Sequence, residues 1–290
     1  MLIQEHALAK INLNLHVTGR RDNGYHSLQS LVVFASVHDT IEVHAAQTVS
    51  LTITGPFAGG LSAGPENLVL KAAFALQTTT DCRLGATIHL QKNLPIASGI
   101  GGGSADAAAT IKALCRLWQL SPPRHIIDKL ALSLGADVPV CMAGTAQIMD
   151  GIGEQLTPAP LFPKIPAVLV NPGVPVSTPE VFQARKGDYS EPFIFTDKKL
   201  GFDQLVTTLK QTHNDLMTPA LQLHPKINNV IDELYQFSGS VLARMSGSGA
   251  TCFALFDTPT HAEKAAETLH KTRPEWWSTA TTFNSNSLIH

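Results

Sequence analysis

The stretch LPIASGIGGGS, residues 94–104, joins a predicted strand at residues 85–92 to a predicted helix at 104–118. Its three consecutive glycines carry no Cβ, so the backbone can approach an anion closely and several N–H groups can converge on it. The start of the helix adds a partial positive charge at the same point. This pattern predicts a phosphate-binding loop. The alternative is a flexible glycine turn that ends in the helix cap Ser104.

Two common nucleotide-binding motifs are absent from this stretch. No lysine follows the glycines, so the lysine-bearing pattern GxxxxGK[ST] is not formed. Ser104 stands where the third glycine of GxGxxG would be, which disfavours a dinucleotide-binding βαβ unit. The loop therefore binds phosphate by another scheme.

Upstream of the loop, residues 10–18 (KINLNLHVT) alternate strictly between apolar and polar side chains. This period of two predicts a half-buried strand whose second face is unusually polar. Further strands are expected at 28–37, 40–46 and 51–55, and helices at 66–77 and 124–134.

Residues 157–166 (TPAPLFPKIP) contain four prolines, and we place a domain boundary here, between residues 157 and 158. The predicted domains are 1–157 and 158–290. Beyond the boundary we expect a strand at 167–171, a short helix near Pro179, a loop, a helix from Pro225, a strand–turn–strand unit at 241–256, a helix at 261–271 and a last strand. Strands and helices alternate without regular βαβ order, which indicates the α+β class.

Two further elements could carry chemistry. The turn SGSG at 246–249 lies between two predicted strands, and it is either a hairpin turn or the opposite wall of the phosphate site. Asp137, in GADVPV, follows the end of a predicted helix and could be an ordinary turn residue. Paired with Lys10, it would stay ionised and could orient a hydroxyl, while the ammonium offsets phosphoryl charge. The residues alone do not bring the two together.

The composition excludes several classes of protein. Apolar residues make up 44% and charged residues 15% of the chain, with a net charge of −2, so nothing attracts it globally to nucleic acid or anionic lipid. The four cysteines form no CxxC pair, and the histidines show no metal-binding spacing. No apolar run reaches the roughly 20 residues of a membrane helix, and we expect no signal or transit peptide. A cytoplasmic protein with no nucleic-acid or membrane partner is predicted.

Three segments, KINL at 10–13, the loop PIASGIGGGSAD and SGSGA at 246–250, resemble the GHMP small-molecule kinase superfamily, in that family's order. Gly24-Tyr25-His26 and the GADVPV segment resemble the branch that acts on cytidine-diphosphate-linked methylerythritol. The resemblance runs from about Glu5 to Phe256. It implies a two-domain GHMP fold with the active site in the cleft between the domains, an ATP-binding N-terminal domain and a ferredoxin-like C-terminal domain.

The resemblance also implies an activity and a set of site residues. The activity is phosphorylation of the C2 hydroxyl of the methylerythritol unit by ATP with Mg²⁺, a step of non-mevalonate isoprenoid synthesis. Lys10 and Asp137 match the catalytic pair. The positions that match the ATP site are Asn67, Pro95, Ile96, Ala97, Ser98, Gly99, Ile100, Gly101, Gly102, Gly103, Ser104, Ala105, Ser246, Gly247, Ser248 and Gly249. The positions that match the substrate site are Asn12, Tyr25, His26 and Phe182.

The chain departs from the family's commoner loop at two positions: Ile100 replaces Leu, a near-neutral apolar exchange, and Ala105 replaces a second Ser. No magnesium ligand is assigned. Without the resemblance, Phe182 alone would be interpreted as a core aromatic.

Two rival functions stay open. One is another GHMP enzyme, such as mevalonate kinase, homoserine kinase or diphosphomevalonate decarboxylase. The other is a nucleotide- or RNA-binding module without catalysis, which the pI near 6.6 and the lack of basic runs disfavour. We expect a monomer or a weak homodimer.

Overall fold

The computed structural model describes residues 2–22 and 24–284. Strands and helices are mixed in it, as the α+β prediction requires. The chain divides into two compact units. Unit 1 comprises the described residues up to Ala9 with Val37–Ile96 and Gly101–Gly144, and unit 2 comprises Lys10–Ser36, Ala97–Ile100 and the described residues from Thr145 onward.

These units do not follow the boundary predicted between residues 157 and 158. Strands β1 (Leu2–Asn12) and β3 (His26–Ala46) each supply residues to both units, so a single cut in the chain cannot separate them. The proline-rich stretch connects β7 (Gln155–Pro158) to β8 (Ile165–Asn171) inside unit 2. As a boundary between family domains, residue 157 stays a prediction.

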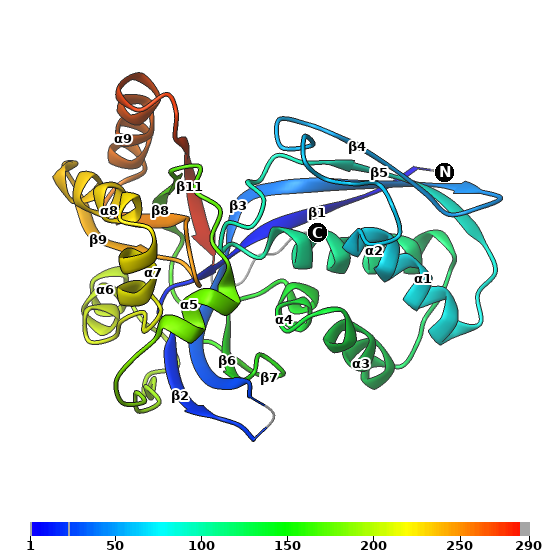
Figure 1. Cartoon of the computed structure of the whole chain (residues 1–290), viewed down its shortest axis with the longest axis horizontal. Helices are drawn as coiled ribbons and strands as arrows, with labels where there is room; N and C mark the ends of the chain where they lie inside the picture. The colour runs from blue at the N-terminus through cyan, green and yellow to red at the C-terminus, as the bar shows by residue number, and fades with distance from the viewer. Residues whose placement is uncertain (1, 23, 285–290) are drawn as a thin grey trace. The chain divides into compact units, whose positions relative to one another are not determined.

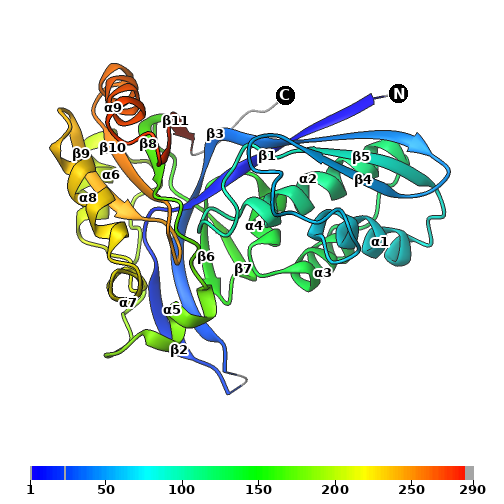
Figure 2. The ribbon, with the colours of Figure 1, turned by 45° about the horizontal axis from the view of Figure 1, so that its top comes forward.

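Unit 1 is a small sheet with helices on one of its faces (Figures 1 and 2). The later half of β3 pairs antiparallel with β5 (Gly85–Gln91), which pairs parallel with β4 (Ser50–Thr54). The helices of this unit are α1 (Leu68–Thr80), α2 (Gly102–Leu117), α3 (Arg124–Leu134) and α4 (Val138–Ala143).

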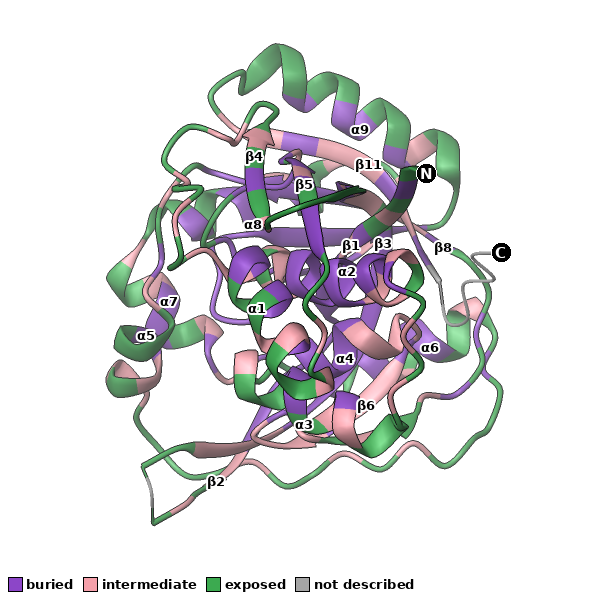
Figure 3. Ribbon diagram, turned by 90° about the vertical axis from the view of Figure 1, so that its right-hand side faces the viewer, coloured by how far each residue is buried: buried purple, intermediate pink, exposed green. Residues whose placement is uncertain are grey.

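Helix α2 is buried along much of its length, and Figure 3 shows it among the other helices of unit 1. Its sequence explains this, because alanine side chains let neighbouring helices approach closely. All residues from Ala105 to Thr110 are buried, and they include one carboxylate, that of Asp106.

Unit 2 contains an antiparallel sheet in the order β11-β8-β10-β9. The other strands of this unit pair with the first half of β3 or with one another. The remaining strands are β2 (His16–Arg20), β6 (Gln147–Gly151), β9 (Ser240–Met245), β10 (Cys252–Phe256) and β11 (Trp277–Asn284). The helices are α5 (Thr178–Ala184), α6 (Phe202–Lys210), α7 (Met217–Leu223), α8 (Lys226–Gln236) and α9 (Pro259–Thr272).

The core of unit 2 lies between this sheet and helices α8 and α9. Helix α9 shows why: Ala262, Ala265, Ala266 and Leu269 repeat every three or four residues and are buried, whereas the opposite side of the helix is exposed (Figure 3). The strand directly before this helix, β10, is buried at every residue.

Several sequence predictions are corrected by the structure. The stretch 10–18 is not one strand, because β1 ends at Asn12 and β2 begins at His16. Its polar side chains are not on an exposed face: Lys10, Asn12, Asn14 and His16 are all buried. The strands expected at 28–37 and 40–46 are one continuous strand, β3.

The predicted start of the helix after the glycines is also corrected. Helix α2 begins at Gly102, two residues before Ser104, and its N-cap is Gly101 with a positive φ of 63°. Ser104 is therefore not the cap. The prediction of α3 at 124–134 is confirmed, whereas α6 and α7 lie in a region expected to be a loop.

Candidate active site

In unit 2, the first part of the glycine loop packs against the SGSG turn through backbone atoms. Gly99 has a φ of 75°, and a Cβ at this position would lie 2.5 Å from the carbonyl oxygen of Ser246. Gly247 has a φ of 56°, and an ideal Cβ there would lie 2.9 Å from the Gly99 carbonyl oxygen. Only glycine allows two chain segments to approach in this way.

Hydrogen bonds connect these two segments to the end of β1. The Ser246 hydroxyl donates to the Gly99 carbonyl (3.1 Å) and accepts the N–H of Asn12 (3.1 Å). The N–H of Lys10 donates to the Ile100 carbonyl (2.9 Å), so β1 is bonded to the loop directly as well. The structure thus brings together three motifs that are far apart in the sequence.

Ser246 has its single hydroxyl proton engaged in this arrangement, and its side chain is fully buried. The hydroxyl of Ser248, also buried, is 2.7 Å from that of Thr178. Both serines of the turn therefore have protein partners, and we interpret them as supports for the loop and the neighbouring chain.

The side chain of Lys10 is held by Asn12 inside unit 2. Its ammonium donates to Asn12 Oδ1 (2.9 Å), and Asn12 Nδ2 donates to Ser30 Oγ (2.7 Å). Because the amide donates on one side and accepts on the other, this network fixes its orientation. Asn12 is thus built to position the Lys10 ammonium.

The glycine triplet forms the first turn of α2 in unit 1. The first N–H groups of a helix have no intrahelical acceptor, so this turn can present them to an anion. Gly103 is exposed and Ser104 is half-buried, whereas the side chain of Ala105 is buried. Of these three residues, Gly103 and Ser104 are the ones accessible to a ligand.

Asp137 is the N-cap residue of α4, and it is half-buried in unit 1. Its side chain makes no capping hydrogen bond to α4. Lys10 belongs to unit 2, so the predicted meeting of this carboxylate with the Lys10 ammonium stays a prediction.

Asn67, predicted to lie near adenine, is the N-cap of α1. Its Oδ1 accepts the N–H of Val69 (2.9 Å), and its Nδ2 donates to the Ser62 carbonyl (2.8 Å). The amide is therefore occupied by the helix start, and its contact with a nucleotide stays a prediction.

The predicted cytosine pocket contains a ring pair. His26 and Phe182 stack with their centroids 5.1 Å apart and an interplanar angle of 19°, while the Tyr25 side chain is largely exposed. Burial lowers the pKa of His26, and the charges of Arg20 and Arg185 lower it further. At neutral pH the imidazole is uncharged, so it offers one hydrogen-bond donor and one acceptor.

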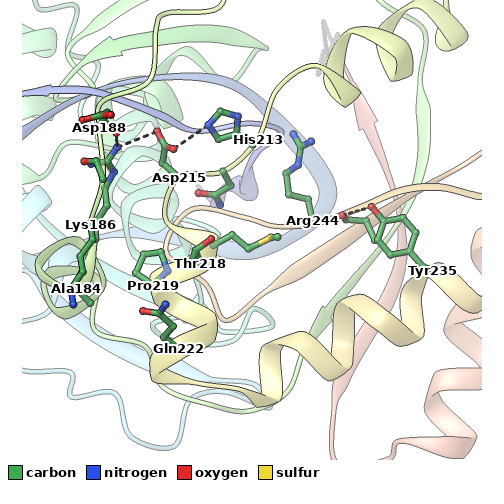
Figure 4. Close-up of a pocket in the computed structure, with 15 residues that line it drawn as sticks. Ala184, Lys186, Asp188, His213, Asp215, Thr218, Pro219, Gln222, Tyr235 and Arg244 are labelled. Carbon is green, nitrogen blue, oxygen red and sulfur yellow. Dashed lines mark hydrogen bonds and ion pairs between the residues drawn. The ribbon is translucent and has the colours of Figure 1, made fainter.

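A hollow of about 500 Å³ in unit 2 was not predicted from the sequence (Figure 4). His213 and Asp215 form a pair at 3.0 Å on its wall. Arg244 also lines it, and its guanidinium donates to the carbonyls of Leu13, Leu209 and Thr212. These donors are already engaged by protein, so the wall is held together without a ligand.

Comparison with known proteins first defines a class. The family model described as "GHMP kinases N terminal domain" matches residues 67–145, and the one described as "GHMP kinases C terminal" matches residues 205–274. A homoserine kinase from Cytophaga hutchinsonii shares the fold, with a TM-score of 0.71 at 18% identity, over 98% of this chain and 96% of that one.

Relatives with higher sequence identity indicate which kind of GHMP kinase the chain resembles. The 4-diphosphocytidyl-2-C-methyl-D-erythritol kinase of Paramagnetospirillum magneticum is 49% identical over 271 residues, which cover 93% of this chain and 95% of the relative. The kinase of the same name from Rhodospirillum rubrum is 49% identical, over 95% of this chain and 91% of the relative. A crystal structure of 4-(cytidine 5'-diphospho)-2C-methyl-D-erythritol kinase matches with a TM-score of 0.81 and 33% identity, over 98% of this chain and 100% of that one.

The chain therefore belongs to the GHMP kinase family and, within it, to the family of the 4-diphosphocytidyl-2-C-methyl-D-erythritol kinases. The predicted resemblance is confirmed. In the part of the chain that the structure describes, no helix combines the length and the apolar character needed to cross a bilayer.

Proposed function

We propose that this protein transfers the γ-phosphoryl group of ATP to the C2 hydroxyl of 4-diphosphocytidyl-2-C-methyl-D-erythritol, giving the 2-phosphate and ADP. The reaction would serve isoprenoid precursor synthesis by the non-mevalonate route. The observation that carries this proposal is the 49% identity to a kinase of that name along 93% of the chain. The bonded arrangement of β1, the glycine loop and the SGSG turn supports it.

The glycine loop is the proposed holder of the ATP phosphates. The N–H groups at the first turn of α2 can bind anionic oxygens, and the exposed Gly103 leaves room for them. The packing of Gly99 against the SGSG turn keeps the preceding backbone in one conformation. A pre-formed cradle of this kind lowers the cost of binding and orienting a phosphoryl group.

Lys10 and Asp137 are the proposed catalytic pair. Asp137 accepts the proton of the C2 hydroxyl while the oxygen of that hydroxyl forms a bond to the γ-phosphorus of ATP. The bond between the γ-phosphorus and the bridging oxygen breaks, and ADP leaves with that oxygen. Lys10, held by Asn12, offsets the negative charge on the transferred group. Positioning and charge stabilisation of this kind account for most of the protein's part in phosphoryl transfer.

The cytidine end of the substrate is proposed to bind at Tyr25, His26 and Phe182. The stacked pair of His26 and Phe182 already forms part of an aromatic site, and a cytosine ring offers both a π-face and a hydrogen-bonding edge. Binding energy from this remote group would select the substrate and help to orient its reacting hydroxyl.

Mg²⁺ would enter with ATP and neutralise part of its phosphate charge. The half-buried hydroxyl of Ser104, on the first turn of α2, is an oxygen ligand that fits this ion. Asp106 is bonded to Lys92, and we assign it no role toward the metal. Among the described residues, no group of three or more His, Cys, Asp and Glu side chains could hold a metal ion.

Four further points belong to the same proposal. The family's ATP-binding and C-terminal domains are placed at 1–157 and 158–290, on either side of the proline-rich stretch, and the two family-model matches fall on the corresponding sides. We place the enzyme in the cytoplasm, as a monomer or weak homodimer, without nucleic-acid or membrane partners.

The test is ADP release by the purified protein with ATP and a panel of alcohols. We expect rapid turnover with 4-diphosphocytidyl-2-C-methyl-D-erythritol and background rates with mevalonate and homoserine. Turnover of mevalonate or homoserine instead would assign the chain to another GHMP activity. ATP binding with no turnover of any alcohol would favour the non-catalytic nucleotide-binding module.

A further inference from the structure

A buried charge cluster in unit 1 connects the two ends of the glycine loop. We call it the Lys92 cluster; it consists of Lys92, Asp39 and Asp106. The Lys92 ammonium contacts Asp39 Oδ2 at 2.5 Å and Asp106 Oδ2 at 2.6 Å. All three residues are at most 3% exposed. Charged groups are rarely buried this completely, so the cluster needs a physical explanation.

One arm of the cluster holds the strand end that leads into the loop. Asp39, in β3, accepts the N–H groups of Asn93 (2.5 Å) and Leu94 (2.8 Å) with its second oxygen. The backbone of Lys92 is itself fixed, because its N–H donates to the Thr54 carbonyl at 2.7 Å. The chain is therefore pinned at the residues directly before Pro95.

The other arm holds the helix that leaves the loop. Asp106 is in the second turn of α2, five residues after Gly101. An ideal Cβ at Gly102 would lie 3.2 Å from the Lys92 ammonium, so the ammonium sits directly beneath the first residue of the helix. One side chain thus connects both ends of the loop.

Lys92 does not itself bind phosphate in this arrangement. Its ammonium is enclosed and shared by two carboxylates, and glycine at position 102 is what allows it to come so close to the helix. The hydrogen bonding of Asp106 within the cluster is one-sided: its Oδ2 contacts Lys92, whereas its buried Oδ1 has no hydrogen-bond partner among the described residues.

We propose that Lys92 and Asp106 are positioning residues for the ATP phosphates: with Asp39 they fix the distance between the strand end at Leu94 and the helix start at Gly102. The glycine loop spans that distance, so its shape depends on the cluster. This inference rests on the proposed function, because it assigns the loop to ATP. A merely structural role would lower stability without a selective effect on ATP.

The test compares two ligands on the full-length protein by isothermal titration calorimetry. One is a non-hydrolysable ATP analogue with Mg²⁺, and the other is CDP. In Lys92→Met and in Asp106→Ala we expect the Kd of the ATP analogue to rise on the order of tenfold to a hundredfold, as small misplacements in an active site do. The Kd of CDP should not change.

Two further variants separate positioning from stability. Asp106→Asn keeps an oxygen that can accept from the Lys92 ammonium, so it should bind the ATP analogue more tightly than Asp106→Ala does. Leu76→Ala, at a fully buried position of α1, should lower the stability of the same unit and leave both affinities as in the wild type.

The inference is wrong if Lys92→Met and Asp106→Ala are less stable but bind the ATP analogue like the wild type. It is also wrong if they lose affinity for both ligands equally. Asp106→Ala, which keeps the pair of Lys92 and Asp39, decides the question if Lys92→Met does not fold. Failure of the wild-type protein to bind the ATP analogue would instead contradict the proposed function.

Discussion

The glycine loop is held by two kinds of chemistry in the two units. In unit 2, its residues 97–100 are fixed by neutral groups: the Ser246 hydroxyl, the N–H of Lys10 and the N–H of Thr251. In unit 1, its flanking residues are fixed by an ammonium and two carboxylates that are almost fully buried.

This difference has a physical consequence. Neutral hydrogen bonds respond little to pH, and each contributes modestly to stability. Buried charges respond to pH and are costly to leave unpaired. We therefore expect variants on the unit 2 side to act through geometry, and variants on the unit 1 side to act through charge as well.

The largest effect on activity is expected from the proposed base. Asp137→Ala should reduce turnover by about 10²–10⁴-fold, the usual contribution of general-base catalysis. Initial rates of ADP release measure this, and CDP binding should persist. The exposed Asp128, paired with Arg124 on α3, gives the control Asp128→Ala, which should retain wild-type turnover. Full activity of Asp137→Ala would remove this residue from the mechanism.

In unit 2, a single added methyl group should disrupt the packing of the glycine loop against the SGSG turn. Gly99→Ala places a Cβ against the Ser246 carbonyl at a positive φ, and we expect a loss of about 2–5 kcal/mol in the free energy of unfolding. Urea denaturation measures it. At Gly59 a Cβ would meet nothing within 4 Å, so Gly59→Ala should match the wild type. Equal stability of the two variants would contradict the close backbone packing described here.

Ser246→Ala should have a smaller effect on stability, about 1–3 kcal/mol, because it leaves the partly buried Gly99 carbonyl and the buried Asn12 N–H without their partner. Thermal unfolding measures this loss of stability. Ser133→Ala, at an exposed position of α3, is the control and should lose less stability. The loss should be nearly the same at pH 6 and pH 8 if the contact is neutral. A strongly pH-dependent loss would show that charge also acts on this side.

In unit 1, the Lys92 cluster should make the free energy of unfolding depend on pH. Burial raises the pKa of Asp106 to about 7, although the Lys92 ammonium opposes the shift and Asp39 adds to it. The folded protein then holds a proton that the unfolded chain releases near pH 4, so this group's contribution makes stability fall as pH rises from about 4 to about 7. Asp106→Asn should remove that contribution.

The measurement is the free energy of unfolding of the wild type and Asp106→Asn between pH 4 and pH 8. Their difference should change in favour of the variant as pH rises. The exposed Asp128→Asn serves as the control and should follow the wild type. Parallel curves for the wild type and Asp106→Asn would show that Asp106 is ionised throughout this range.

The smallest effect is expected at the cytidine site. Burial lowers the pKa of His26, so protonation that removes its acceptor occurs below the ordinary histidine range. CDP affinity should weaken only as the pH falls below the range in which histidine ordinarily titrates, and His26→Gln should lose this dependence. The same pH dependence in both proteins would exclude His26 as its source.

The parts of the site that were predictable from the sequence are those with a local signal. The glycine loop and the SGSG turn both contain glycines that the backbone requires, and the structure brings Gly99 and Gly247 into contact. The alternating polar residues of KINLNLHVT were visible as well. The burial of their polar face was not predictable from the sequence. Asn12 shows why, because its hydrogen-bond partners are Ser30, 18 residues away, and Ser246, 234 residues away.

The missed features depend on contacts between distant residues. The strands expected at 28–37 and 40–46 left out Asp39, yet the structure includes it in β3 and pairs its buried carboxylate with Lys92, 53 residues later. The start of α2 was misplaced because glycine usually disfavours helix and serine favours the cap. One overlooked signal for the Lys92 cluster was available: Asp106 is a charged residue inside an alanine-rich helix.

The most direct test of the proposed activity is the ³¹P NMR spectrum of a reaction containing the purified protein, ATP, Mg²⁺ and 4-diphosphocytidyl-2-C-methyl-D-erythritol. We predict a new phosphomonoester signal, retention of the substrate's diphosphate signals and conversion of ATP to ADP. A spectrum in which ATP is consumed but only inorganic phosphate appears, or in which no new phosphomonoester forms, would contradict it.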